Sequence, residues 1–119
     1  MTEGHEQRKQ RREQTIFYLE AVDVETDQEI GRVVDMTPDG LMIINKDPLA
    51  INRIYHLKIK LPKELAGDTE LYFKAECRWC RQSINDQFFD AGLRITDISA
   101  DDKLRIDMVL KFYTFPSDI

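Results

Sequence analysis

The chain has 119 residues, of which 42% are hydrophobic and 33% are charged, and its 17 basic and 22 acidic side chains give a net charge of −5. This length favours one domain with its own hydrophobic core. No apolar run approaches the roughly 20 residues that a membrane-spanning helix needs, and cysteines are few, so the composition argues against membrane insertion, a disulfide-rich secreted fold and a disordered chain.

The charge is unevenly distributed along the chain. Residues 1–14 hold four basic side chains against three acidic ones and carry +1, whereas the rest of the chain carries −6. The four cations are Arg8, Lys9, Arg11 and Arg12. A segment so rich in charge and so poor in apolar residues cannot pack a core. We therefore expect a flexible basic segment over residues 1–14 and a single domain over residues 15–119.

The first half of this domain is expected to form three strands. Thr15–Glu25 is rich in β-branched and aromatic residues, and its apolar positions change parity at Ala21–Val22, which predicts a β-bulge. Two short apolar segments follow, Glu29–Met36 and Leu41–Asn45. The tetrapeptide Thr37-Pro38-Asp39-Gly40 between them suits a type I turn, because proline stands second and glycine fourth.

Three later segments alternate apolar and polar residues: Ile54–Leu61, Leu71–Arg81 and Phe89–Ile95. Such alternation places one row of side chains in a core and the other row in solvent. In the second of these segments, the row that faces the core ends at Trp79. Six strands with short connections predict a mainly β fold, a small antiparallel barrel or sandwich.

The C-terminal part changes to a helical period. Ser99 is a candidate N-cap, with Asp102 three residues later, and we expect the helix at about residues 100–114, before Pro116. Four apolar residues then recur on one helical face: Ile106, Val109, Leu110 and Tyr113. The helix is expected to lie across the barrel and seal its core.

Catalytic motifs are not apparent. The two histidines, His5 and His56, fall in the polar N-terminal segment and in the solvent-facing row of a strand, and no nucleophile elbow, phosphate-binding loop or zinc-protease spacing occurs. The carboxylates of an acidic surface do not by themselves define an acid–base pair. The sequence therefore favours a binding protein over an enzyme, with no cofactor and no metal.

Cys77 and Cys80 form a C-x-x-C pair, which is read as a structural feature. A zinc site would need two further ligands, and a redox pair would begin a helix, whereas these residues lie within an alternating strand. An offset of three residues along a strand points the two side chains to opposite faces. We therefore expect Cys77 in the core and Cys80 on the surface, as two free thiols suited to a reducing cytoplasm.

Two polar clusters remain as candidate binding residues. In the basic segment, arginine offers a planar fork of donors for phosphate oxygens and for the O6 and N7 edge of guanine. In the turn, Asp35 supplies an acceptor, Thr37 supplies a hydroxyl group, and Gly40 lets a ligand approach the backbone.

Taken together, Arg8-x-x-x-Arg12 and Asp35-x-Thr37-x-x-Gly40 resemble the motifs of the PilZ-domain family, R-x-x-x-R followed by [DN]-x-[ST]-x-x-G. The resemblance continues through Trp79, Gly92–Ile95 and Asp97–Ser99, and it covers about residues 6–114. It implies a six-stranded antiparallel β-barrel with a C-terminal α-helix. It also implies a bacterial, cytoplasmic receptor for cyclic di-GMP.

The resemblance assigns roles to individual residues. Arg8 and Arg12 would clamp the ligand, with Lys9 and Arg11 beside them. Asp35 would accept hydrogen bonds from a guanine, Thr37 would supply its hydroxyl group, and Gly40 would keep the surface open. Trp79 would lie near the ligand or at the rim of the core. Thr37 replaces the more common serine, and Gln7 stands where an extra arginine favours two bound ligands, although Lys9 and Arg11 leave the number of ligands open.

The resemblance also suggests how a signal would pass. A mobile cationic segment that docks when an anionic ligand binds would turn binding into an order change, which an effector protein would read. One alternative is a PilZ-like interaction module that binds no nucleotide. Another is a small nucleic-acid-binding barrel with Tyr18 and Tyr72 as stacking residues, although the acidic body of the domain disfavours DNA or RNA polymers.

Overall fold

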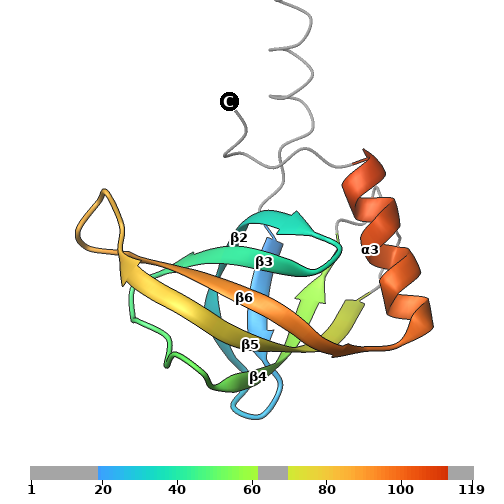
Figure 1. Ribbon diagram of the computed structural model, residues 1–119, viewed down its shortest axis with the longest axis horizontal. Coiled ribbons are helices and arrows are strands. Elements are labelled where there is room, and N and C mark those ends of the chain that lie inside the picture. The colour runs from blue at the N-terminus through green and yellow to red at the C-terminus, as the bar shows by residue number, and fades with distance from the viewer. Residues whose placement is uncertain (1–18, 62–69, 113–119) are drawn as a thin grey trace, which may run out of the picture.

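The computed structural model describes residues 19–61 and 70–112, which form a closed antiparallel β-barrel of six strands followed by one helix (Figure 1). The elements are β1 (Leu19–Asp23), β2 (Gln28–Thr37), β3 (Gly40–Asn45), β4 (Ile54–Lys60), β5 (Glu70–Gln82), β6 (Phe89–Ile98) and α3 (Ala100–Phe112). The predicted fold class is confirmed. The basic segment, the start of the first predicted strand and the last two residues of the predicted helix lie outside the described residues.

The strands follow the order β1-β2-β3-β6-β5-β4, and β4 pairs with β1 to close the barrel. The β1–β2 register shifts between Ala21 and Val22, where the sequence predicts a bulge, but the extra residue is Ile30 on β2. Strand β1 itself keeps its alternation, with Leu19, Ala21 and Asp23 buried. The β2–β3 hairpin turns at the predicted tetrapeptide Thr37–Gly40. Thr37 and Gly40 are paired ladder residues, and only Pro38 and Asp39 connect the two strands.

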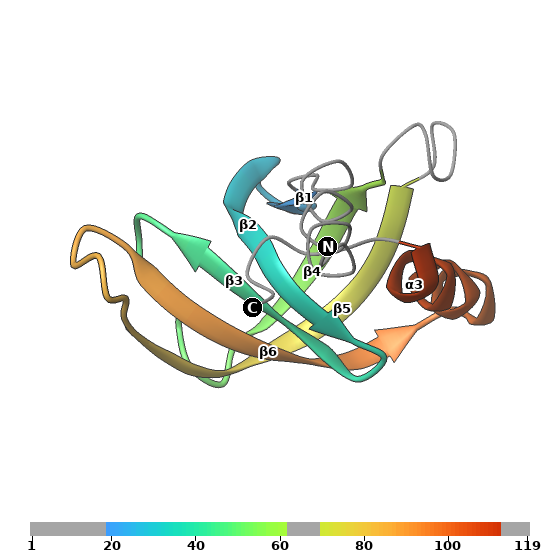
Figure 2. The ribbon, with the colours of Figure 1, turned by 90° about the horizontal axis from the view of Figure 1, so that it is seen from above.

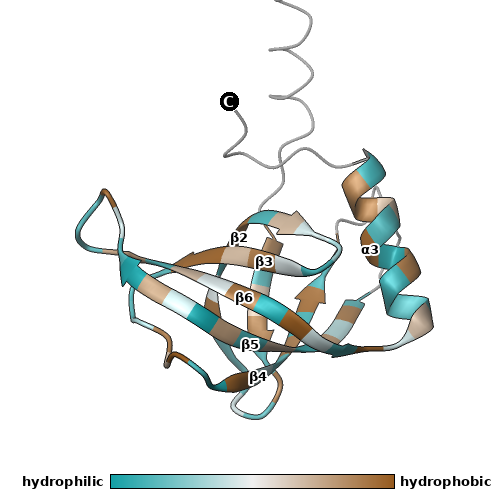
Figure 3. Ribbon diagram, in the orientation of Figure 1, coloured by the Kyte–Doolittle hydropathy of each residue, from teal (hydrophilic) through white to brown (hydrophobic). Residues whose placement is uncertain are grey.

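The interior of the barrel is apolar and is filled from every strand. Along β4 and β5 the buried side chains alternate with exposed or half-buried ones, as the periodicity predicts, and Figure 3 shows the alternating bands along the strands. Residues without exposed surface come from β1, β2, β3, β4 and β5 alike: Ala21, Val33, Ile43, Leu57, Ile59, Leu71, Ala75 and Cys77.

Helix α3 lies beside the barrel, past the ends of β5 and β6, and packs against β5 (Figure 2). Ile106 and Val109 are buried in the core cluster and Leu110 packs against it, as predicted for one apolar face. The predicted cap is also present: the Ser99 hydroxyl oxygen accepts from the Asp102 amide at 3.1 Å, and the hydroxyl donates to Asp102 Oδ2 at 3.1 Å. No helix in the described ranges is long and apolar enough to span a membrane.

A second bulge alters the expected parity of β5. The β5–β6 register shifts between Cys77 and Trp79, so Arg78 is the extra residue. The prediction that Trp79 ends the core-facing row is therefore wrong, and its side chain lies on the outer face with 36% of its surface exposed. The surface position expected for Cys80 is corrected too: it is half-buried and packs against the core, and its sulfur accepts from the Leu49 amide at 3.4 Å.

Candidate ligand-binding groove

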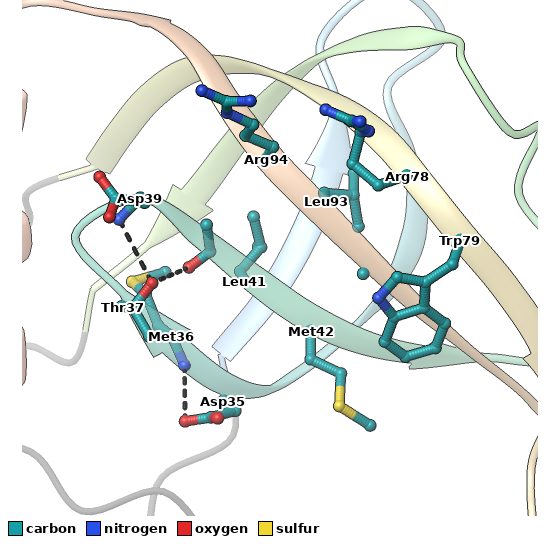
Figure 4. Close-up of a pocket in the computed structure, with 12 residues that line it drawn as sticks. Asp35, Met36, Thr37, Asp39, Leu41, Met42, Arg78, Trp79, Leu93 and Arg94 are labelled. Atoms are coloured by element: carbon teal, nitrogen blue, oxygen red, sulfur yellow. Dashed lines mark hydrogen bonds between the residues drawn. The ribbon is translucent and has the colours of Figure 1, made fainter.

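The outer face of the barrel carries a groove of about 300 Å³ across β2, β3, β6 and β5. Its lining comes from the β2–β3 hairpin between Asp35 and Met42, from Arg78 and Trp79 of β5, and from residues 92–94 of β6 (Figure 4). All four candidate site residues in the described part of the chain, Asp35, Thr37, Gly40 and Trp79, are lining residues. Arg8, Lys9, Arg11 and Arg12 lie outside the described residues.

Strand pairing explains why these residues meet. In one row across the sheet, Thr37 pairs with Gly40, and Gly40 pairs with Arg94. In the next row on this face, Asp35 pairs with Met42, Met42 with Gly92, and Gly92 with Trp79. This row therefore crosses four strands, β2, β3, β6 and β5. Residues far apart in the sequence thus form two adjacent rows on one face.

A bulge directs Asp35 outward. Val33 is fully buried, so strict alternation would also place Asp35 in the core, but the β2–β3 register shifts between these two residues. The shift leaves Asp35 exposed and Met36 buried. The Asp35 Oδ1 atom accepts from the Met36 amide at 2.9 Å. The carboxylate is therefore held at the groove, and this bond does not use its second oxygen.

The turn is organised around the Thr37 hydroxyl group. Its oxygen accepts from the Asp39 amide at 3.2 Å, and the hydroxyl donates to the Gly40 carbonyl at 3.5 Å (Figure 4). A Cβ atom on Gly40 would overlap the Leu93 carbonyl oxygen. Glycine at this position is therefore required for close packing of β3 against β6, which is a different reason from the ligand access expected from the sequence.

Two arginines that sequence reasoning did not single out complete the groove. Arg94 follows Gly92 on β6, and Arg78 is the bulge residue of β5. Figure 4 shows both guanidinium groups at the rim opposite Asp35. Arg78 also forms a long ion pair with Glu76, at 3.9 Å. Only the register, which places Arg94 opposite Gly40, reveals that these cations share a surface with the Asp35–Gly40 motif.

The groove thus combines two carboxylates, Asp35 and Asp39, with a hydroxyl group, an indole and two guanidinium groups. Guanidinium groups suit phosphate oxygens and the acceptor edge of guanine, and a carboxylate suits the guanine N–H donors. Among the described residues, no group of three or more His, Cys, Asp or Glu side chains could hold a metal ion. The lining therefore offers both hydrogen-bond donors and acceptors to a polar ligand.

The two cysteines lie on the inner side of the sheet behind the groove. Both are free thiols. Burial raises the pKa of the Cys77 thiol, and the neighbouring Cys80 raises it further. A thiol with a raised pKa stays protonated near neutral pH and is a poor nucleophile. Cys77 is therefore a packing residue of the core.

Comparisons with known proteins agree with this architecture. The family model for the PilZ domain matches residues 6–112. Among solved structures, the apo state of MrkH from K. pneumonia has a TM-score of 0.63 at 14% sequence identity, covering 79% of this chain and 45% of that one. The Bacillus subtilis inhibitor of motility (MotI/DgrA) has a TM-score of 0.57 at 17% identity, covering 79% of this chain and 46% of that one. The chain thus spans less than half the length of either protein. No curated protein matches its sequence.

Proposed function

The chain belongs to the PilZ-domain family, and on that premise we propose that it is a cyclic di-GMP receptor whose binding site is the groove on the outer face of β2, β3, β6 and β5. The observation that carries the proposal is the meeting of Asp35, Thr37 and Trp79 with two arginines, Arg78 and Arg94, on one surface. A receptor of this kind is a binding module and needs no catalytic group.

The ligand offers chemistry that fits this lining. Cyclic di-GMP carries two guanine bases and two phosphates. Asp35 would accept from the N–H edge of one guanine, and the guanidinium groups of Arg78 and Arg94 would donate to its O6 and N7 atoms or to phosphate oxygens. Thr37 would supply a hydroxyl group, and Gly40 would keep the hairpin surface open. Trp79 would form the far wall against the ligand.

The basic segment would supply the rest of the site. Leu19, where the described residues begin, pairs with Val33, so the chain enters β1 beside the end of β2 that carries Asp35. Arg12 precedes Leu19 by seven residues, and an extended chain of that length reaches roughly 25 Å. Arg8 and Arg12, with Lys9 and Arg11 beside them, are therefore within reach of the groove and would clamp the phosphates.

Binding of this kind would also generate a signal. The groove is formed by the barrel, whereas the clamp belongs to a segment too charged to pack by itself. An anionic ligand would neutralise the segment and order it over the groove. The newly ordered surface would then be recognised by an effector protein.

Isothermal titration calorimetry with cyclic di-GMP tests the proposal. We expect binding by the wild-type chain and a loss of roughly 100-fold or more when Arg8→Ala and Arg12→Ala are combined, because each charged hydrogen bond contributes about 1.5–3 kcal/mol. Asp35→Ala should cost roughly tenfold or more on the same basis. Asp47→Ala is the matched control, because this exposed carboxylate follows β3 and is not among the described residues that line the groove.

Two outcomes would contradict separate parts of the proposal. If the wild-type chain gives no heat with cyclic di-GMP at tens of micromolar, the chain is not a receptor for this ligand, and a PilZ-like interaction module without nucleotide becomes the better description. If the double arginine variant binds as well as the wild type, the ligand binds but the basic segment is not its clamp.

A further inference from the structure

The Trp79 indole packs directly on the backbone of Gly92, where only glycine leaves room for it. A Cβ atom built on Gly92 would overlap Nε1 and Cε2 of the Trp79 indole and would lie 2.8 Å from its Cζ2 atom. Gly92 is the ladder partner of Trp79 on β6, and it is also the partner of Met42 on β3. The indole therefore lies across the backbone of β6 and extends from β5 towards β3.

The indole is also covered by a cation from its own strand. The guanidinium carbon of Arg81 lies over the Trp79 ring, 4.8 Å from the ring centroid. This distance is within the range of a cation–π contact. Arg81 follows Trp79 by two residues and projects from the same face of β5, although it is not among the described residues that line the groove. The ring thus lies against the Gly92 backbone and under the Arg81 guanidinium group.

This arrangement determines which part of the indole a ligand can meet. The nitrogen lies on the edge of the ring nearer the middle of the groove (Figure 4). Arg81 occupies the position over the ring where a purine would otherwise stack. The nitrogen edge carries an N–H donor, and an indole N–H can only donate a hydrogen bond.

We propose that Arg81 is a positioning residue of the ligand site: it holds the Trp79 indole against Gly92 and so keeps the indole N–H directed into the groove, where it would donate to an oxygen of the ligand. This inference rests on the proposed cyclic di-GMP function for the identity of the ligand. The contacts of Trp79 with Gly92 and Arg81 exist in the chain without ligand. Arg81 would therefore influence affinity through Trp79 without contacting the ligand.

Trp79 is the single tryptophan of the chain, so its fluorescence reports this site alone. In Arg81→Ala we expect faster acrylamide quenching and faster local depolarisation of the indole in the unliganded protein. Affinity for cyclic di-GMP should fall roughly twofold to fivefold, because an exposed cation–π contact contributes about 0.5–1 kcal/mol. Arg81→Lys keeps a cation near the ring but lacks the planar face of arginine, so it should restore both properties only in part.

The chain offers a matched control. Arg53 stacks on Tyr55 at the same 4.8 Å, and neither residue is among the described residues that line the groove. Arg53→Ala should leave the indole quenching and the ligand affinity unchanged. Gly92→Ala disturbs the same indole through its contact with β6, since the added Cβ must displace the ring. We expect a larger loss of affinity than in Arg81→Ala, with the same increase in quenching.

A double-mutant cycle distinguishes positioning from direct contact. Trp79→Phe keeps a ring for Arg81 but removes the N–H group, so adding Arg81→Ala to it should cost little further affinity.

Full additivity, or lower affinity in Arg81→Ala with unchanged quenching, would show that Arg81 acts on the ligand directly and would overturn the inference. Unchanged quenching and affinity would also overturn it, while leaving the receptor function intact. A wild-type chain that binds no cyclic di-GMP would overturn the receptor function. Acrylamide quenching of Trp79 in the wild type and in Arg81→Ala would then still show whether Arg81 holds the indole.

Discussion

Single residues inserted into the strands decide which side chains reach the groove. Strict alternation would bury the Asp35 carboxylate, but the bulge between Val33 and Asp35 turns it outward. The bulge at Arg78 turns the Trp79 side chain outward in the same way. Each bulge moves one polar or amphipathic side chain to the outer face while the apolar residues on both sides of it remain in the core. If either strand kept all its residues but paired without its bulge, strict alternation would turn the functional side chain inward.

Thr37 allows the effects of a hydroxyl group and of a methyl group to be separated. Thr37→Val keeps the shape but removes the oxygen that accepts from the Asp39 amide, so we expect a loss of about 1 kcal/mol in the free energy of unfolding. If the hydroxyl group also contacts the ligand, affinity should fall by a further roughly fivefold to tenfold. Urea denaturation and calorimetry measure the two quantities.

Thr37→Ser is the control for that experiment. It keeps the hydroxyl group and removes only the methyl group, so both stability and affinity should stay close to the wild type. Equal affinities for the valine and serine variants would show that Thr37 shapes the turn without contacting the ligand.

Among the elements, those with local signals were predicted well. Alternation identified β4, β5 and β6, the Thr37–Gly40 segment identified the β2–β3 hairpin, and Ser99 identified the start of α3. The bulges at Val34 and Arg78 were missed, because an inserted residue shows itself only in the register with the partner strand. Arg78 and Arg94 were missed for the same reason: their place in the site depends on pairing across β3, β6 and β5, which periodicity along a single strand does not reveal.

The cap of α3 is an element whose contribution to stability can be measured. Ser99→Ala removes the hydroxyl group that bonds both the amide and the carboxylate of Asp102, so we expect a loss of about 1 kcal/mol in the free energy of unfolding. Ser83→Ala, in the β5–β6 connection, is the control and should have a smaller effect. A Ser99→Ala variant as stable as the wild type would mean that packing of Ile106 and Val109 alone holds the helix start.

The charge of the whole molecule restricts the kinds of anion it can bind. Its acidic side chains outnumber the basic ones, yet two arginines stand at one groove and four basic residues precede the barrel. A long nucleic acid would meet the acidic surface as well as this cluster, whereas a small dianion would meet only the cluster. Global acidity and a local anion site are therefore compatible.

Salt dependence tests this distinction. Between 0.1 M and 1 M salt the screening length falls from about 10 Å to about 3 Å, so affinity for cyclic di-GMP should drop several-fold. Binding of single-stranded DNA should be undetectable at 0.1 M salt, as measured by fluorescence anisotropy with labelled oligonucleotides. Tight DNA binding with a steep salt slope would instead support a nucleic-acid-binding barrel.

The position of β6 in the sheet has a consequence for synthesis of the protein. β6 is the last strand among the described residues, yet it pairs with β3 on one side and β5 on the other. It also supplies the backbone beneath Trp79 and the backbone beside Gly40. A nascent chain therefore cannot assemble the groove until residue 98 has left the ribosome. Until then β3 and β5 each have an unpaired edge, which is the stage at which the growing chain is most exposed to wrong pairing or aggregation.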